Sequence, residues 1–331
     1  MTASPSTEET MMTFTQRDLV RLHSGISGMT PKLLRQILQQ AHDDAIPLAD
    51  LFSLSAVDWQ TKFHMPPKVA EALASSTDEQ AEQTLAKLRE KRFRLVTFLD
   101  EDYPPSLKRV DDAAPPLLYI HGDTALLRQP GIGFGGSRNV SRDGQRATDE
   151  LARSAVKDHQ ATVVSGHAKG VDTIAHQSAL AAGGVTILVL PEGALKFRLN
   201  NELRSYWAEA ANRIVVVTQF APNEPWATRN AMARNATVLG LSRAFCVIEA
   251  GDEQGGTWAA GITALRMGVP LYVLDYETLP ESALGNKKLI ERGGQPLKFQ
   301  KEMTLPGKLD SSQGSAGDRN DNDQPEQLTL F

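Results

Sequence analysis

Two short turns rich in glycine, serine and basic residues are the parts of this sequence best suited to chemistry. Each follows a short apolar segment that is expected to be a strand (132–134 and 161–164), and each leads into an expected helix (141–157, and another from about residue 170). Backbone N–H groups at a helix N-terminus attract anions, and a nearby lysine or arginine adds to that attraction. The residues predicted to bind phosphate or another anion are Gly136, Ser137 and Arg138 in the first turn and Ser165, Gly166 and Lys169 in the second.

The glycines do not form the pattern of a dinucleotide-binding turn. The first turn reads Gly135-Gly136-Ser137-Arg138 rather than G-x-G-x-x-G, and no acidic residue closes the second strand to hold a ribose hydroxyl. The alternative is a generic α/β turn in which glycine only relieves backbone strain. We favour the anion site because two such turns, each with its own cation, occur in succession.

A third turn of this kind and a polar cluster occur later in the chain. Gly255, Gly256 and Thr257 precede another expected helix, where they are also suited to an anion. Arg234 and Asn235 belong to the polar segment WATRNAMARN, which also contains Trp226. Trp226 and Trp258 are equally compatible with core packing and with stacking on nucleic-acid bases.

No complete set of catalytic residues is evident in the sequence. Glu249 has no placed partner, and one carboxylate alone is weak evidence for acid–base catalysis. Asp172 and His176 are four residues apart, and we expect them to cap or tie a helix rather than bind a metal. We therefore predict a binding protein rather than an enzyme, with no cofactor and no metal.

Composition is that of an ordinary water-soluble protein. The 331 residues are 41% hydrophobic and 23% charged, and no apolar run approaches the ~20 residues of a membrane span. The N-terminus is polar rather than signal-like, and the single cysteine, Cys246, lies in an apolar segment and cannot form an internal disulfide. These features predict a cytoplasmic protein without membrane contact.

The acidic charge is concentrated at the two ends of the chain. The net charge is −5, of which residues 304–331 carry −3, and Glu8 and Glu9 carry the remainder. Residues 10–303 are therefore close to neutral, which leaves room for a local basic groove that binds nucleic acid.

The chain is predicted to contain two folded domains between two disordered ends. Apolar strands alternate with helices over residues 91–303, which predicts an α/β, Rossmann-like, mostly parallel sheet with helices on both faces. Ligands of such sheets bind beyond the carboxyl ends of the strands, where the predicted anion-binding residues fall. Residues 14–90 predict a small helical domain, SAM-like or helix-hairpin-helix-like, whose Gly25–Gly28 turn we interpret as a tight helix connection rather than a DNA contact. The ends are residues 1–13 and 304–331.

Several motifs in the chain resemble those of the DNA-processing protein A family, known as DprA or Smf. They occur in the family's order from about residue 14 to 300, and several unrelated patterns recur together. The motifs are D-x-x-Y-P-P-x-L at 100–107, P-P-x-L-x-x-x-G-D at 115–123, GGSR at 135–138, S-G-x-A-x-G-V-D-x-x-A-H at 165–176, A-L-x-A-G-G at 179–184, R-N at 234–235, G-L-S at 240–242 and G-N-x-x-L-I-x-x-G at 285–293.

This resemblance implies a non-enzymatic role in DNA uptake (competence), recombination or repair. It implies that single-stranded DNA binds in the pocket, that the core forms a homodimer, and that a RecA-type recombinase is a partner. The phosphate-binding residues carried over from the family are Gly136, Ser137, Arg138, Ser165, Gly166 and Lys169, with Arg234 and Asn235 beside them.

Three departures from the family pattern make the recombinase partnership less secure than DNA binding. The family's Y-P-x-x-N element is replaced by KFRLN at 196–200. The usual S-G-x-L-x-T-A loop is Gly-Gly-Thr-Trp at 255–258, and the C-terminal winged helix of many members is missing.

The acidic tail ends in a pentapeptide that looks like a sliding-clamp-binding motif. Residues 327–331 read QLTLF, and two leucines and a phenylalanine suit an apolar cleft while the glutamine is held by hydrogen bonds. The alternative is an apolar terminus without a partner. We favour clamp binding through Gln327, Leu328, Leu330 and Phe331.

Three functions are compatible with the sequence. The favoured one is a single-stranded-DNA-binding mediator, tethered to the clamp by its tail. A second is a nucleotide-derivative sensor or hydrolase of the lysine-decarboxylase-like superfamily, although Ala260 stands where those enzymes carry a catalytic glutamate. A third is an interaction adaptor that does not bind DNA.

Overall fold

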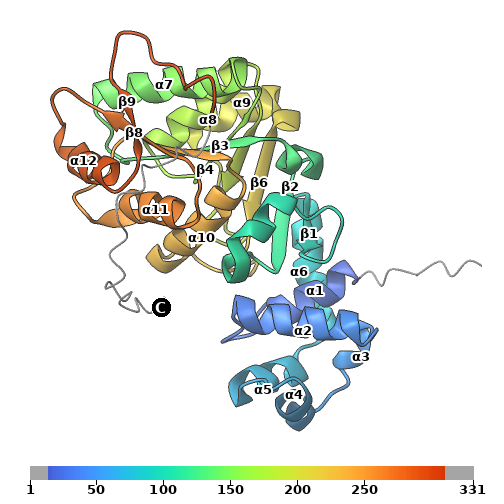
Figure 1. Cartoon of the computed structure of the whole chain (residues 1–331). Helices are drawn as coiled ribbons and strands as arrows, with labels where there is room; N and C mark the ends of the chain where they lie inside the picture. The colour runs from blue at the N-terminus through green and yellow to red at the C-terminus, as the bar shows by residue number, and fades with distance from the viewer. Residues whose placement is uncertain (1–13, 310–331) are drawn as a thin grey trace, which may run out of the picture.

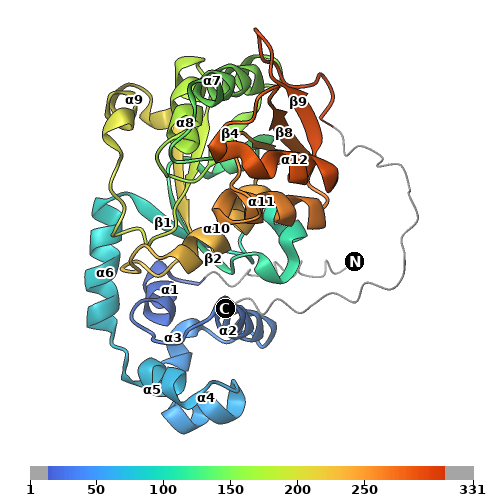
Figure 2. The same ribbon diagram turned by 90° about the vertical axis from the view of Figure 1, so that its left-hand side faces the viewer.

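The computed structural model describes residues 14–309, in which a helical N-terminal part adjoins a larger α/β part (Figure 1). Residues 1–13 and 310–331, with the QLTLF motif, lie outside the described residues. Six helices form the N-terminal part, and Figure 2 shows α2 to α5 below the sheet and α6 rising beside β1. They are α1 (Gln16–His23), α2 (Pro31–Asp43), α3 (Leu48–Leu51), α4 (Ala56–Lys62), α5 (Pro67–Ser75) and α6 (Asp78–Glu90).

Capping residues explain where these helices begin. Thr30 accepts a hydrogen bond from the Leu33 N–H and Pro31 takes the first turn of α2, as the sequence predicts. Thr77 caps α6 in the same way. Between α1 and α2, Gly25 and Gly28 both have positive φ, and the Ile26 side chain between them is buried. This connection is therefore a compact turn anchored to the helical core.

One sheet runs through the rest of the described chain, with strand order β1-β2-β6-β5-β4-β3-β7-β8-β9. Among these nine described strands, antiparallel pairing occurs where β2 meets β1 and β6, and the other pairs are parallel. The strands are β1 (Phe93–Thr97), β2 (Leu117–His121), β3 (Gly131–Gly135), β4 (Thr162–Ser165), β5 (Thr186–Val189), β6 (Ile214–Thr218), β7 (Ala244–Val247), β8 (Leu271–Asp275) and β9 (Gln295–Lys298).

Helices cover both faces of the sheet, as predicted. On one face α7 (Arg142–Lys157) and α8 (Val171–Ala181) pack on Ile132 and Val163. On the other face α10 (Thr228–Gly240), α11 (Gly255–Arg266) and α12 (Leu284–Glu291) pack on Val164 and Phe245. Neighbouring residues such as Val163 and Val164 face opposite layers because side chains alternate along a strand. Figure 1 shows the strands between α7 and α8 above and α10 and α11 below.

The helical part and the sheet share a hydrophobic core. Side chains of α1, α2 and α6 belong to the same buried cluster as Tyr119 on β2 and Val216 on β6. The His23 ring stacks on the Tyr119 ring, and its Nδ1 lies 3.0 Å from the Tyr119 hydroxyl oxygen. The N-terminal helices therefore pack directly against the α/β part.

Two segments differ from the sequence predictions. The alternation of strands and helices in the sequence predicts one helix over residues 200–212. In the structure this segment is broken into η3 (Asn201–Leu203), α9 (Arg204–Glu209) and η4 (Ala211–Arg213). The edge strand β9 was not predicted, because its four residues include Pro296, which only an edge strand tolerates easily. The remaining connections contain η1 (Pro105–Ala113), η2 (Thr124–Arg128) and η5 (Glu281–Ala283). Within residues 14–309, no helix has the length and apolar character needed to span a membrane.

Candidate functional site

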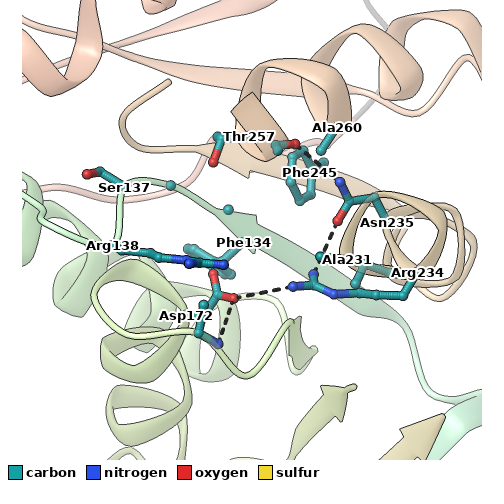
Figure 3. Close-up of a pocket in the computed structure, with 15 residues that line it drawn as sticks. Phe134, Ser137, Arg138, Asp172, Ala231, Arg234, Asn235, Phe245, Thr257 and Ala260 are labelled. Atoms are coloured by element: carbon teal, nitrogen blue, oxygen red, sulfur yellow. Dashed lines mark hydrogen bonds and ion pairs between the residues drawn. The ribbon is translucent and has the colours of Figure 1, made fainter. Parts of the chain in front are cut away.

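One cavity contains most of the predicted phosphate-binding residues, and we call it the main cavity for that reason. It lies where the strand order reverses, at the carboxyl ends of β3 and β7. From β3 the chain proceeds outward through β4, β5 and β6 on one side and returns to β7 on the other. Open α/β sheets bind ligands at this switch point. The cavity holds about 270 Å³ and is lined by Phe134, Gly135, Gly136, Ser137, Arg138, Ala168, Asp172, Ala231, Arg234, Asn235, Val238, Phe245, Gly256, Thr257 and Ala260 (Figure 3).

The first predicted turn forms one wall of this cavity. A Cβ on Gly135 would lie 2.7 Å from Cζ of Phe245, so glycine lets the Phe245 ring cross β3. Gly170, with φ of 74°, packs against the same turn, because a Cβ there would lie 2.7 Å from the Arg138 carbonyl oxygen. These two close approaches hold the Gly136–Arg138 backbone between β7 and the start of α8.

Two arginines approach the cavity from opposite walls. Arg138 is exposed, whereas the Arg234 side chain on α10 is only 13% exposed. An Arg234 nitrogen lies 3.9 Å from an Asp172 carboxylate oxygen, and another donates to Oδ1 of Asn235 at 3.2 Å. Nε of Arg234 is buried and has no hydrogen-bond partner among the described residues. Figure 3 shows the Arg138 and Arg234 guanidinium groups directed toward each other across the cavity.

Burial shifts the pKa values of Asp172 and Arg234 in opposite directions. Desolvation lowers the pKa of Arg234, while the Asp172 and Glu192 carboxylates oppose that shift. Burial raises the pKa of Asp172, and the nearby Arg234 opposes this shift. Each ion therefore offsets part of the cost of burying the other. Arg138 and Arg234 together leave the cavity with one more cation than carboxylate.

The prediction of a free helix N-terminus after the first turn is wrong. The carboxylate of Glu249 already occupies the N-terminus of α7, where it accepts hydrogen bonds from the Ser141 N–H at 3.1 Å and from the Ser141 hydroxyl at 2.5 Å. The Tyr276 hydroxyl donates to the same carboxylate at 3.1 Å. Glu249 is buried, so an internal anion takes the place that the sequence suggested for a ligand.

The second predicted turn supports the cavity more than it lines it. The Ser165 hydroxyl is buried and donates to the Phe134 carbonyl oxygen at 2.7 Å, so it ties β4 to β3. Ser165 and Gly166 do not line the main cavity, and α8 starts only at Val171. Lys169 lines a neighbouring hollow of about 280 Å³ that shares Arg138 with the main cavity.

His176 and Asp172 tie this second turn to its surroundings, as predicted. His176 is fully buried, with Nε2 2.9 Å from the Gly166 carbonyl oxygen and Nδ1 2.7 Å from the Thr186 hydroxyl. Burial lowers the pKa of His176 to about 3, so its ring is neutral at physiological pH. Asp172 accepts a hydrogen bond from the Ala168 N–H at 3.3 Å.

The third predicted turn opens directly onto the cavity. α11 begins at Gly255 after Gln254, and no side chain of residues 14–309 caps its first turn. Gly256 and Thr257 line the cavity, whereas Gly255 does not. The Asn235 side-chain amide donates to the Gly256 carbonyl oxygen at 3.2 Å, which links α10 to the start of α11. Among the helix starts beside the cavity, this one is suited to receive a ligand.

The two tryptophans of this region have different environments. Trp258 is 8% exposed and packs in the core beside α12, with the Arg292 guanidinium carbon 4.9 Å from its ring centroid. Trp226 is 51% exposed, and the Arg138 guanidinium carbon lies 5.6 Å from its ring centroid. An exposed aromatic ring is thus placed beside the most accessible cation of the cavity.

The structure brings together seven of the eleven residues that the sequence predicted for phosphate binding. The four that do not line the main cavity are Ser165, Gly166, Lys169 and Gly255. The sequence missed the apolar floor, because Phe134, Val238 and Phe245 look like ordinary core positions until the strand order is known. It also missed the pairing of Asp172 with Arg234, which are 62 positions apart and meet only in the tertiary fold.

This arrangement is suited to holding an anion. Two guanidinium groups, the backbone of the first turn and the uncapped start of α11 all converge on one hollow. Ala260 contributes only a methyl group to the wall, and within residues 14–309 no cluster of His, Cys, Asp and Glu could hold a metal ion.

Comparison with known proteins places the chain in a family. The family model of DNA recombination-mediator protein A matches residues 94–305, which include every strand except the first residue of β1 and all the cavity-lining residues. The chain belongs to the DNA recombination-mediator protein A family. The resemblance to DprA and Smf proteins inferred from the motifs is therefore confirmed.

Similar DNA recombination-mediator proteins A support the same fold. The DNA processing protein DprA of Streptococcus pneumoniae is 31% identical over 206 residues, which cover 62% of this chain and 71% of that protein. Its X-ray structure matches with a TM-score of 0.71 and 25% identity, over 86% of this chain and 95% of that one. DNA processing protein A from Helicobacter pylori, whose structure was described for its single-stranded DNA binding mode, matches with a TM-score of 0.53 and 29% identity over 62% of this chain and 91% of that chain.

Proposed function

We propose that this protein binds the phosphate backbone of single-stranded DNA in the cavity at the sheet switch point, and that it acts as a mediator of DNA processing, recombination or repair. Family membership and the likeness to the Helicobacter pylori protein support this role. The observation that carries the proposal is the convergence of Arg138 and Arg234 with the open start of α11 on one cavity.

The chemistry of the cavity favours a phosphodiester over other anions of similar charge. Arg138 is exposed and can follow a polymer that enters from solvent, while the buried Arg234 gives the inner end of the cavity its positive charge. Trp226, beside Arg138, can stack on a base next to the bound phosphate. A base that is free to stack in this way belongs to a single strand.

Hydrolysis of a nucleotide derivative is the weaker alternative. The position equivalent to the catalytic glutamate of such enzymes is Ala260, whose methyl group lines the cavity. Glu249 is committed to the start of α7, and Asp172 faces Arg234. None of these groups is free to activate water, so we favour binding without turnover.

Three further partners belong to the same proposal. We propose that the core forms a homodimer, that a RecA-type recombinase is a partner, and that residues 327–331 tether the protein to the sliding clamp. The family resemblance supports the first two, and the QLTLF sequence supports the third. In this scheme the tail increases the local concentration of the DNA-binding cavity near the clamp.

The test is equilibrium binding of a fluorescent single strand at several salt concentrations. We expect Arg138→Ala to weaken binding by about tenfold at low salt and to lower the salt slope by about one, because one phosphate contact is lost. The matched control is Arg266→Gln on α11, whose exposed side chain donates to the Thr263 hydroxyl and lies outside the residues that line the main cavity. Equal effects of the two substitutions, or salt-insensitive binding, would contradict the proposed site.

The tail is tested with the chain that lacks residues 327–331, by measuring its binding to the purified sliding clamp and to the same fluorescent single strand. We expect this deletion to abolish binding to the purified sliding clamp and to leave the affinity for DNA unchanged. Arg138→Ala should weaken binding to DNA and leave binding to the sliding clamp unchanged. Clamp binding that persists after the deletion would remove the tether from the proposal.

A further inference from the structure

A second hollow combines basic and aromatic side chains at the junction of the two parts of the molecule. It holds about 410 Å³ and lies between the end of α6, the end of β2 and the segment that leads to α9. Figure 2 shows α6 and α9 on the same side of the molecule. The residues that line it are Glu90, Lys91, Arg92, Phe93, His121, Phe197, Arg198, Leu199 and Trp207.

Positive charge dominates this hollow. Lys91, Arg92 and Arg198 contribute three cations, and Glu90 is the one carboxylate among the lining residues. Burial lowers the pKa of Lys91 and the nearby Arg198 lowers it further, so these two cations repel each other, while Glu90 opposes the shift. No ion pair to a described carboxylate is found for any of the three. A bound anion would relieve this repulsion.

Aromatic rings form the other side of the hollow. The Trp207 ring stacks on the His121 ring, with centroids 5.1 Å apart and an angle of 27° between the planes. Phe197 packs obliquely on Trp207 at 6.0 Å. Phe197 is buried, but Trp207 remains partly exposed. The hollow therefore presents an accessible ring on a rigid aromatic base, next to three cations.

The loop between β4 and α8 connects this hollow to the main cavity. Ala168 lines the main cavity, and its neighbour His167 contacts the segment that forms the second hollow. The His167 ring lies 5.4 Å from the Phe197 ring, and its Nε2 is 3.1 Å from the Arg198 carbonyl oxygen. This loop therefore contacts both sites, and its Lys169 lines the neighbouring hollow that shares Arg138 with the main cavity.

Packing alone does not account for these residues. Phe93 and Phe197 are buried core residues, but Arg92 and Arg198 are exposed and make no ion pair with a described carboxylate. Arg92 has φ of 56°, the left-handed conformation that often follows the end of a helix, here α6. Arg92 and Arg198 therefore present their guanidinium groups to solvent beside the hollow.

We propose that this hollow is a second contact for the single strand that enters the main cavity, with a base stacked on Trp207 and a phosphate held by Lys91, Arg92 and Arg198. Alternating stacking and phosphate contacts are the usual chemistry of single-strand binding. This inference rests on the proposed function, because it extends the same strand across the loop from Gly166 to Gly170. It predicts that long strands bind more tightly than strands that fill only the main cavity.

The experiment measures the affinity of single strands of increasing length for the full chain and its variants. We expect the wild-type affinity to rise once the strand is long enough to reach both the main cavity and the second hollow. Trp207→Ala and Arg198→Gln should each lower the affinity for these longer strands by about tenfold. Both variants should bind shorter strands normally. Trp207→Phe should retain most of the length effect, and Arg266→Gln should retain all of it. Thermal unfolding of each variant checks that the fold is intact.

Each outcome separates this inference from the proposed function. If Trp207→Ala and Arg198→Gln leave the length effect unchanged while Arg138→Ala weakens all strands, the main site stands and the second contact is wrong. Equal weakening of short and long strands by Trp207→Ala would also overturn it. If Arg138→Ala has no effect at any length, the proposed function itself is wrong. Binding of a free mononucleotide at the second hollow, without the length effect, would assign the hollow to a separate ligand and overturn the inference.

Discussion

The N-termini of α7 and α11 are the two helix starts on either side of the switch point, and only one of them is open. Each follows a parallel strand and a glycine-containing loop. At α7 the buried Glu249 carboxylate accepts the Ser141 N–H and hydroxyl. At α11 none of the described side chains caps the first turn, and Gly256 and Thr257 line the cavity.

This difference shows that a glycine turn before a helix does not by itself make an anion site. Glu249 follows β7 and precedes α11 in the sequence, yet its side chain crosses to α7. It therefore closes one helix start while the neighbouring start stays available. In the site that we propose, the phosphate therefore contacts the start of α11 and the two arginines rather than the start of α7.

Acid is expected to have the largest effect on this arrangement, because it titrates the histidine beneath the second turn. The folded state keeps His176 neutral down to a pKa of about 3, whereas the unfolded chain binds a proton near pH 6.5. At a pH between these two pKa values, the chain binds a proton when it unfolds. The free energy of unfolding therefore falls as the pH is lowered through this range. We expect about 4 kcal/mol of stability to be lost from this group between pH 6.5 and 3.5.

The measurement is denaturant unfolding of wild type and His176→Gln across this pH range. The variant should start less stable and should show a flatter dependence on pH. His42→Gln is the matched control, because the His42 side chain on α2 is exposed. A pH dependence that is identical in wild type and His176→Gln would show that His176 is not the group that titrates.

Glu249→Gln tests the closed helix start. The substitution keeps the shape of the side chain but removes the charge that receives the Ser141 and Tyr276 hydrogen bonds. We expect a loss of about 3 kcal/mol in the free energy of unfolding, since hydrogen bonds to a buried charge are stronger than neutral ones. Glu281→Gln, at an exposed position in η5, should change stability little. Similar unfolding curves for the two variants would contradict the stabilising role of Glu249 beside Ser141, the N-cap of α7.

Thr257→Glu tests the open helix start by giving α11 a carboxylate of its own. Thr257 is the third residue of α11, where a glutamate interacts favourably with the helix dipole. We expect the affinity for single-stranded DNA to fall by about tenfold, because the new charge competes with phosphate. Thr263→Glu, two turns further along the helix, is the control. Unchanged DNA binding in Thr257→Glu would mean that the start of α11 is not part of the site.

Much of the fold was accessible from the sequence because its determinants are local. Apolar runs of four or five residues alternate with amphipathic helices, and this pattern predicts a parallel sheet wherever the strands lie. Thr30-Pro31 likewise predicts the start of α2 from two adjacent residues. By contrast, β9 and the broken segment around α9 carry weak local signals, so the sequence did not predict them correctly.

The sequence by itself determined the family, the α/β class and the presence of basic residues at the ends of several strands. Those conclusions depend on residue types and on spacing along the chain. Only the tertiary structure decided that Glu249 closes α7, that Asp172 faces Arg234, and that α11 opens onto the cavity. Each of these facts requires side chains from distant segments to meet, and the order of strands in the sheet determines which segments meet.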